Sequence, residues 1–478
     1  ISGFYIYKTY FYVTINITMD IRLYNSLTKK KEEFKPIKKK EVGLYTCGPT
    51  VYNYPHIGNL MPYIIWDVLK RILKVKGYKV KHIMNITDVG HLTSDADDGE
   101  DKLVKASRES GKNAWQIAEF FIKVFRNNLS NLNITEPTKF FRATDTVKEQ
   151  IEFVRILNEK GYLYKTSDGM YFDTAKIEDY GKIANLANVE LQEGARVAKS
   201  NEKKNLTDFA VWKFSPENKI RDMEWESPWG LGFPGWHLEC SVMSRMELGD
   251  TFDIHTGGIE HLTVHHPNEM AQSEAVTGEL QANYWLHNAH VKYDGGKMSK
   301  SKGTFVTLED LRAKGFSPMA FRFLILQNHY RKPLNFTMES LQAAQNGLEA
   351  IIREIAFYGK PKGRCDKFEE EFYEAVADNL NTSKALAVFQ KVIDADCKDS
   401  AKLATILKMD EVLGLRLDGL VKNAMDISDE AKIILDERAK ARDAKDWERS
   451  DKLRDKLIAL GVEVHDTPDG QKAIHIKF

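Results

Sequence analysis

The stretch that decides the fold runs from residue 41 to residue 88 and reads EVGLYTCGPTVYNYPHIGNLMPYIIWDVLKRILKVKGYKVKHIMNITD. Its first part, EVGLYTCG, is a short apolar run that predicts a buried strand, and MPYIIWDVLKRILKVKG predicts a helix. YKVKHIMNITD then predicts a second strand. Strand, helix and strand at this spacing predict a βαβ unit and therefore a parallel sheet.

The sequence on either side predicts that this fold is split by an insertion. The sheet pattern resumes at DTFDIHTGG, residues 250–258, whereas residues 141–225 have hairpin character and a charged loop. Beyond about residue 340, apolar residues at three- and four-residue spacing predict helices, and residues 462–478 predict two short strands. We therefore predict an α/β protein with a split Rossmann-type parallel-sheet core and a connective insertion. A helical bundle and a small α/β C-terminal domain follow.

Composition limits the classes of partner. The chain has 478 residues, with 69 basic and 69 acidic ones, so a polyanionic partner would be held by local patches. Its four cysteines, Cys47, Cys240, Cys365 and Cys397, are too few and too scattered for a disulfide framework, which predicts a reducing compartment and a cytoplasmic location. No apolar run approaches the ~18 residues that span a bilayer, so we expect no membrane partner.

Two motifs suit a nucleotide. PTVYNYPHIGN, residues 49–59, lies where the first strand ends and the helix begins, and a helix N-terminus offers unpaired amides to phosphate. GGKMSKSKGT, residues 295–304, carries Lys297, Lys300 and Lys302 between glycines, and such lysines can neutralise a departing pyrophosphate. Taken alone, a His-Ile-Gly triplet is usually an ordinary loop, and a lysine cluster is usually a solvated one.

In this order on a split βαβ core, the two motifs resemble the HIGH and KMSKS signatures of class I aminoacyl-tRNA synthetases. The chain from Met19 onward resembles the cysteinyl-tRNA synthetase family. The strings that carry this resemblance are YTCGPTVYNYPHIGN, WESPWGLGFPGWHLECSVMS, FDIHTGGIEHLTVHHPNEMAQSEA and KMSKSKGT. Asn59 stands where class I enzymes often have a second histidine; its amide can donate to phosphate but carries no charge.

The resemblance implies one zinc ion per chain, bound by Cys47, Cys240, His265 and Glu269. Two thiolates, an imidazole and a carboxylate are a plausible zinc set, although sequence spacing alone would not have assembled it. Between His265 and His266 the residues leave the choice open, and the family pattern prefers His265. Pro267 stands where the family usually has glutamate, and Thr256 where glycine is common, which affects loop geometry more than ligand chemistry.

In that family the zinc binds the thiolate of the substrate cysteine. Shape complementarity is worth roughly 1–3 kcal/mol for the difference between cysteine and serine, whereas translation needs a discrimination of about 10⁴. Hydrolytic editing at a second active site is another way to reach this discrimination, but the insertion at residues 141–225 is short for such a site. A borderline-soft metal lowers the pKa of a thiol far enough for direct coordination, which an alcohol does not match.

The resemblance also implies the roles of the remaining residues. The partners are L-cysteine, ATP with Mg²⁺ and tRNA(Cys), and the chain is expected to be a monomer. The catalytic residues are expected to be His56, Asn59, Lys297 and Lys300. The ATP-binding residues are expected to be Pro49, Thr50, His56, Gly58, Asn59, His255, Gly257, Gly258 and Lys300. The amino-acid pocket is expected to include Thr87, Trp236 and His237. For these three residues and for His255, core packing is an equal alternative.

The sequence pattern and the family resemblance together predict the domain boundaries. Residues 1–18 are expected to be an upstream extension, with Met19 as a plausible start. The other expected boundaries are 19–140 for the first half of the catalytic core, 141–225 for the insertion, 226–290 for the second half, 291–345 for the KMSKS loop and stem-contact region, 346–425 for a helical tRNA-binding domain and 426–478 for a small anticodon-binding domain.

The C-terminal tail contains regularly spaced basic residues. Five basic residues recur at four- and three-residue steps, which predicts one helix face that meets RNA phosphates, with Trp447 stacking on a base. They are Arg438, Arg442, Lys445, Arg449 and Lys452. The interleaved acids fit a solvated helix that packs through Trp447 at least as well. The rivals are a ligase that joins cysteine to an amino-sugar acceptor, and an inactive RNA-binding paralogue.

Overall fold

The computed structural model describes residues 19–89, 102–184, 202–216, 221–296, 305–467 and 470–475. The expected upstream extension, 1–18, and the loop residues Lys297, Lys300 and Lys302 lie outside these ranges. Among the helices within them, none is long and apolar enough to cross a membrane.

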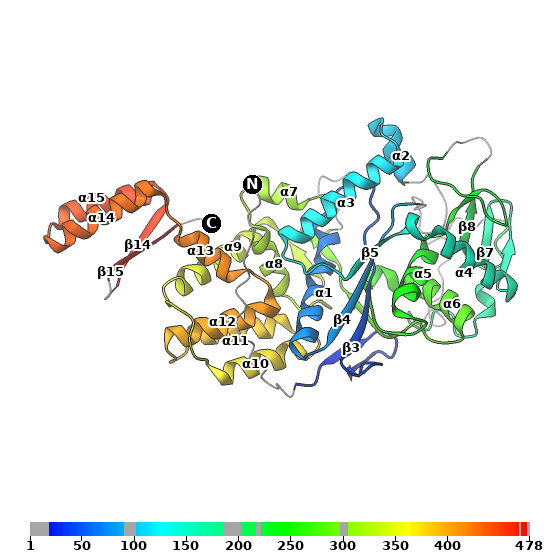
Figure 1. Ribbon diagram of the computed structural model, residues 1–478, viewed down its shortest axis with the longest axis horizontal. Coiled ribbons are helices and arrows are strands. Elements are labelled where there is room, and N and C mark those ends of the chain that lie inside the picture. The colour runs from blue at the N-terminus through cyan, green and yellow to red at the C-terminus, as the bar shows by residue number, and fades with distance from the viewer. Residues whose placement is uncertain are drawn as a thin grey trace.

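The stretch 41–88 forms the βαβ unit that its pattern predicts, at the centre of a five-stranded parallel sheet (Figure 1). The strands are β3 (Glu41–Thr46), β4 (Lys79–Ile86), β5 (Lys139–Arg142), β10 (Phe252–Gly258) and β11 (Ala282–Asn288). Their order is β11-β10-β3-β4-β5, and every neighbouring pair is parallel. The direction of winding reverses between β3 and β10, and ligands of such sheets bind at the carboxyl ends of the strands beside this point. The predicted fold class is confirmed.

Helices cover both faces of this sheet. Apolar side chains alternate along β3, so that Val42 and Leu44 belong to one core cluster and Tyr45 to another. The first cluster packs against α1 (Ile57–Val75), and the second contains residues of α5 (Trp236–Leu248) and α6 (His265–Thr277). The link from β4 to β5 contains α2 (Lys102–Ser110) and α3 (Ala114–Asn131).

The insertion between β5 and α5 contains an antiparallel sheet. Its elements are α4 (Val147–Glu159), β6 (Leu163–Lys165), β7 (Gly169–Phe172), β8 (Phe209–Phe214) and β9 (Gly232–Pro234). The sheet has the order β6-β7-β8-β9, so its last strand lies beyond residue 225. Gly235 then caps α5 where the backbone passes so close to β8 that a Cβ atom would lie 2.0 Å from the carbonyl oxygen of Ala210. This approach sets the start of the helix that carries Cys240.

The helical region shares one hydrophobic core with α1. Its helices are α7 (Leu308–Ala313), α8 (Pro318–Leu326), α9 (Met338–Ile355), α10 (Asp366–Ala377), α11 (Thr382–Ile393), α12 (Asp399–Leu413) and α13 (Leu417–Met425). Short strand pairs are β1 (Arg22–Asn25) with β2 (Lys30–Glu33), antiparallel, and β12 (Val291–Tyr293) with β13 (Leu334–Phe336), parallel. The fully buried Arg322 of α8 binds Asp67 of α1, which joins this region to the sheet domain through an ion pair.

The tail folds as a helical hairpin and a strand pair, at the end of the molecule opposite the insertion (Figure 1). Its elements are α14 (Asp429–Asp443), α15 (Trp447–Ala459), β14 (Val462–Thr467) and β15 (Gly470–His475). The prediction that the five basic residues share one helix face is wrong. α14 ends at Asp443, Lys445 adopts a left-handed φ of 59°, and Asp446 caps a new helix. Arg438 is buried and binds Asp466 and Gln471.

Candidate active site

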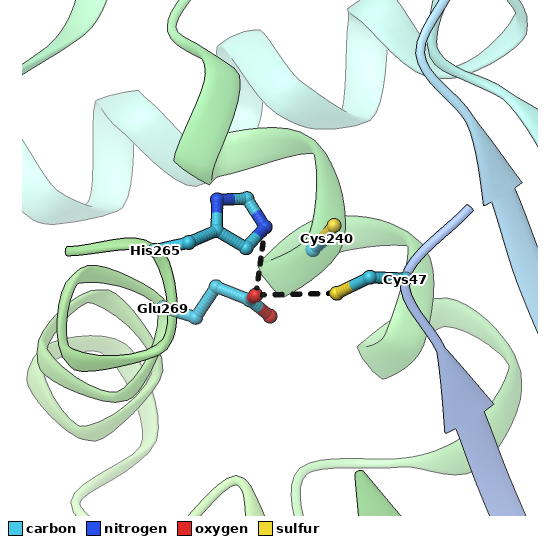
Figure 2. A group of neighbouring side chains, drawn as sticks. All are labelled: Cys47, Cys240, His265 and Glu269. Atoms are coloured by element: carbon cyan, nitrogen blue, oxygen red, sulfur yellow. Dashed lines mark hydrogen bonds and ion pairs between the residues drawn. The ribbon is translucent and has the colours of Figure 1, made fainter. Parts of the chain in front are cut away.

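The structure brings together the four side chains that the resemblance assigns to a metal. One ligand atom from each of Cys47, Cys240, His265 and Glu269 lies within 4.8 Å of the others, and all four residues are buried. Figure 2 shows the side chains pointing toward one another from the loop just after β3 and from α5 and α6. The Nε2 atom of His265 lies 3.0 Å from Oε1 of Glu269, and the Cys47 thiol donates to that oxygen at 3.9 Å.

Local backbone geometry places these residues. Cys47 follows the last residue of β3, at the carboxyl edge of the sheet and beside the switch point. Gly48 comes next, and a Cβ atom there would lie 1.7 Å from the carbonyl oxygen of Asn85, so only glycine lets the loop leave between the strands. His265 and Glu269 are one turn apart on α6, which puts both on the same helix face.

The donor set fits a zinc ion. Ligand atoms on one tetrahedral zinc stand roughly 3.3–3.8 Å apart, because zinc bonds to nitrogen and sulfur are about 2.0–2.3 Å long. The observed spread of at most 4.8 Å therefore needs only a small contraction around the ion. Sulfur, nitrogen and one carboxylate oxygen form a donor set that suits zinc and does not suit magnesium or calcium, which prefer oxygen.

The charges in the cluster also favour a cation. Burial and a hydrogen bond with Cys240 raise the pKa of the Cys47 thiol well above its usual value. Burial opposes ionisation of Cys240 as well, but hydrogen bonds with Cys47 and His265 lower its pKa to about 6. Although burial disfavours charge on His265, Glu269 and Cys240 raise its pKa to about 10. The buried carboxylate and thiols thus favour a positive charge among them, which a bound metal ion would supply.

Further histidines surround the cluster. His255 Nε2 lies 2.8 Å from Oε2 of Glu269, and the Nδ1 atoms of His237 and His265 are 2.9 Å apart. His266 Nε2 lies 3.5 Å from the Cys47 sulfur, and its Nδ1 lies 2.7 Å from His287. A second group with metal-ligand spacing therefore consists of Cys47, His255, His266 and Glu269. We propose His265 as the ligand because its group alone contains both cysteines.

Sequence reasoning missed two members of this surrounding layer. His287 lies near the end of β11, one residue before the strand stops at the same sheet edge, and its position there was an available signal. Glu239 precedes Cys240 and is fully buried; it accepts a hydrogen bond of 2.7 Å from the Thr87 hydroxyl. A buried glutamate beside a proposed ligand has no local sequence signature.

The nucleotide-type loop is ordered by a capping box at the start of α1. The Nδ1 atom of His56 accepts from the backbone N–H of Asn59, and the Oδ1 atom of Asn59 accepts from the backbone N–H of His56, both at 3.2 Å. Burial lowers the pKa of His56 to about 4, so its ring is neutral at pH 7. Because Nδ1 accepts, the proton stays on Nε2. Asn59 keeps its NH₂ group as a donor.

One cavity of about 300 Å³ contains both this loop and the metal cluster. The expected site residues that line it are Cys47, Pro49, Thr50, His56, Gly58, Asn59, Trp236, Cys240, Gly257, Gly258 and His265. Thr87, His237, His255 and Glu269 are buried just behind, and are not among the described residues of its wall. His255, which was expected at the nucleotide, has its Nε2 atom 2.8 Å from Oε2 of Glu269.

Two expected residues of the nucleotide site, Lys297 and Lys300, lie outside the described residues. The chain that follows them is described from Phe305, whose ring centroid lies 5.4 Å from that of His56. The backbone N–H of Ile57 also donates to the carbonyl of Val306 at 2.9 Å. The segment after the KMSKS string thus lies against the HIGH-type loop.

Comparisons with known proteins agree with this arrangement. The model of the class I (C) tRNA synthetase catalytic domain matches residues 33–346, and that of the cysteinyl-tRNA ligase anticodon binding domain matches residues 424–472. Cysteine–tRNA ligase 1 of Burkholderia lata is 47% identical over 456 residues, covering 95% of this chain and 97% of that protein. The cysteine–tRNA ligase of Novosphingobium aromaticivorans is 45% identical over 472 residues, covering 93% and 95%.

Among solved structures, Mycobacterium tuberculosis methionyl-tRNA synthetase in complex with methionyl-adenylate has a TM-score of 0.56 at 14% identity. The match covers 82% of this chain and 95% of that one. At this identity it shows a shared fold.

Proposed function

Because this chain belongs to the cysteinyl-tRNA synthetase family of class I enzymes, we propose that it activates L-cysteine with ATP and transfers it to the 3′ end of tRNA(Cys). One observation carries the proposal beyond the family name. The thiol-rich cluster and the nucleotide-type loop line the same cavity of about 300 Å³. A single bound cysteine would therefore have its side chain at the cluster and its carboxylate toward the phosphates.

We propose that Cys47, Cys240, His265 and Glu269 hold one zinc ion at the inner end of the cavity. The ion would supply a borderline-soft site that favours a thiolate over an alcohol. The surrounding histidines fix the ligands: His255 holds the second oxygen of Glu269, and His237 orients the ring of His265. Such outer partners commonly set metal affinity. We place the reaction in the cytoplasm because both thiols must stay reduced.

In the first step, the cysteine carboxylate attacks the α-phosphorus of ATP, and pyrophosphate leaves. The protein contributes alignment and electrostatics. The Nε2 proton of His56 and the NH₂ group of Asn59 are donors at the start of α1, where the helix dipole favours an anion. Lys297 and Lys300 are proposed to neutralise charge on the leaving group. Trp236 is proposed to bound the amino-acid end of the cavity.

The decisive experiment is cysteine-dependent ATP–pyrophosphate exchange, run beside serine and with metal content measured on the same preparation. We expect about one zinc per chain, exchange with cysteine, and discrimination against serine of about 10⁴. Absence of exchange would favour the inactive RNA-binding paralogue. Charging of a tRNA(Cys) transcript then separates the synthetase from a ligase that uses an amino-sugar acceptor.

The tail is proposed to bind the anticodon through Trp447. This side chain is 56% exposed at the first turn of α15, and the Arg442 guanidinium lies 5.6 Å from its ring. Exposed aromatic rings beside cations suit unpaired bases. Trp447→Ala is expected to raise the KM for tRNA by about tenfold, since one stacked base is worth about 1–3 kcal/mol. ATP–pyrophosphate exchange should not change. Equal KM values for the variant and the wild type would remove Trp447 from the RNA interface.

A further inference from the structure

Aromatic side chains gather where the cavity opens to solvent, and the site described above assigns them no role. Tyr54, from the loop after β3, and Phe120, from α3, are 41% and 42% exposed. The Tyr54 ring centroid lies 6.0 Å from that of Phe120 and 5.2 Å from that of Phe121, in edge-to-face arrangements. We call Tyr54, Phe120 and Phe121 the mouth cluster.

The mouth cluster is continuous with the cavity and lies beside cationic side chains. Tyr54 and Phe121 line the cavity, whereas Phe120 lies just outside its wall. The Nζ atom of Lys112 lies 5.4 Å from the Phe120 ring centroid. The Nζ atom of Lys102 lies 5.4 Å from the ring of Tyr52, another lining residue. Figure 1 shows α2, which begins at Lys102, and α3, which carries Phe120 and Phe121, together at one edge of the core.

We propose that the mouth cluster binds the unpaired 3′-terminal nucleotides of the tRNA by stacking, with Lys112 and Lys102 facing their phosphates. The inference rests on the proposed function, because the terminal ribose must enter the cavity for the second step. The nucleotides that precede it must then cross the mouth. Single-stranded nucleic acids are held by aromatic rings and neighbouring cations, in a sequence-tolerant way.

The chemistry of the patch favours RNA over a protein partner. A protein interface core is depleted in lysine, whereas here Lys112 lies beside the exposed ring of Phe120 and Lys102 beside the half-buried ring of Tyr52. The chain as a whole has no net charge, so local groups must supply the attraction for a polyanion. Edge-to-face packing leaves part of the Phe120 ring exposed to accept a base.

The test pairs a protein change with an RNA change. Phe120→Ala is compared with the wild type for binding of an intact tRNA(Cys) transcript and of a transcript that lacks its unpaired 3′ nucleotides. We expect the variant to weaken binding of intact tRNA by about tenfold and to leave binding of the truncated tRNA unchanged. Phe120→Trp, which keeps a stacking surface, should bind like the wild type.

Two controls separate this result from other causes. Met246→Ala removes an apolar side chain of similar exposure, 45%, from the surface of α5, and should alter neither binding constant. Cysteine-dependent exchange, which needs no tRNA, should be unchanged in Phe120→Ala. If the wild type showed no cysteine-dependent exchange, the proposed function would be wrong. The binding of intact and truncated tRNA tests the mouth cluster independently of that result. Equal losses on both transcripts, no loss on either, or reduced exchange in Phe120→Ala would overturn the inference.

Discussion

Cys240→Ser is expected to lose its metal and to reduce cysteine-dependent ATP–pyrophosphate exchange by more than about 100-fold. Loss of an outer partner alone commonly costs about 10- to 100-fold in metal affinity, and Cys240 is proposed as a direct ligand. Serine has nearly the same size as the buried Cys240 side chain, so we expect the fold to be kept. Metal content per chain and exchange rate are the primary measurements.

The matched control is Cys397→Ser, which changes a half-buried thiol in the helical region. It should keep full metal content and exchange. A second measurement does not depend on activity: in cobalt-substituted wild type, saturating cysteine should add a sulfur-to-metal charge-transfer band, and serine should not. Stoichiometric zinc together with full activity in Cys240→Ser would show that the ligand set is wrong.

The sequence could predict those parts of the structure whose signals are local. The stretch 41–88 predicts its βαβ unit because strand and helix periods repeat within a few residues, and the structure confirms it. The metal cluster is different, because Cys47 and Cys240 come from opposite halves of the split core. No spacing rule joins them, and the resemblance alone brought them together before the structure did.

In the tail, a local signal led to a wrong prediction. The spacing of basic residues from Arg438 to Lys452 stays helical across the turn between α14 and α15. Such spacing does not reveal that a single residue, here Lys445, adopts a left-handed conformation and ends the helix. The burial of Arg438 depends on Asp466, which arrives from β14. Periodicity describes one element at a time, so it cannot reveal a partner from another.

The second large effect is expected at the buried junction between α1 and the helical region. Asp67 Oδ2 accepts from Arg322 at 2.6 Å and from Arg71 at 2.7 Å, and Oδ1 accepts from the backbone of Thr135 at 2.8 Å. Arg322 is fully buried and also donates to the carbonyl of Leu413 at 2.7 Å. Breaking one partner of a buried ion pair costs about 3–5 kcal/mol, because the other charge is left uncompensated.

Asp67→Asn is therefore expected to lower the free energy of unfolding by about 3 kcal/mol or more at pH 7, measured from the urea transition by circular dichroism. The matched control is Arg126→Gln, which breaks an exposed pair with Glu136 and should cost less than about 1 kcal/mol. A comparable loss of unfolding free energy in both variants would show that the buried ion pair contributes no more to stability than the exposed one.

The pH dependence of the free energy of unfolding tests independently whether the ionised Asp67 carboxylate stabilises the fold. Burial alone would raise the pKa of Asp67, but Arg322 and Arg71 lower it to about 2, below its usual value of 3.8. A depressed carboxyl pKa stabilises the fold above the unfolded-state pKa, and this contribution is lost as the pH falls toward the folded-state value. The difference between wild type and Asp67→Asn should therefore stay constant from pH 8 to 5, and shrink below about pH 4.

A double variant distinguishes an unpaired charge from a packing defect. Asp67→Asn combined with Arg322→Met removes the buried guanidinium that the first change leaves without its carboxylate. Because the two residues contact each other, their costs should not add, and the double variant should lose less stability than the sum of the single ones. Additive losses would mean that Asp67 and Arg322 act independently, with each loss arising from its other contacts, such as those to Thr135 and Leu413.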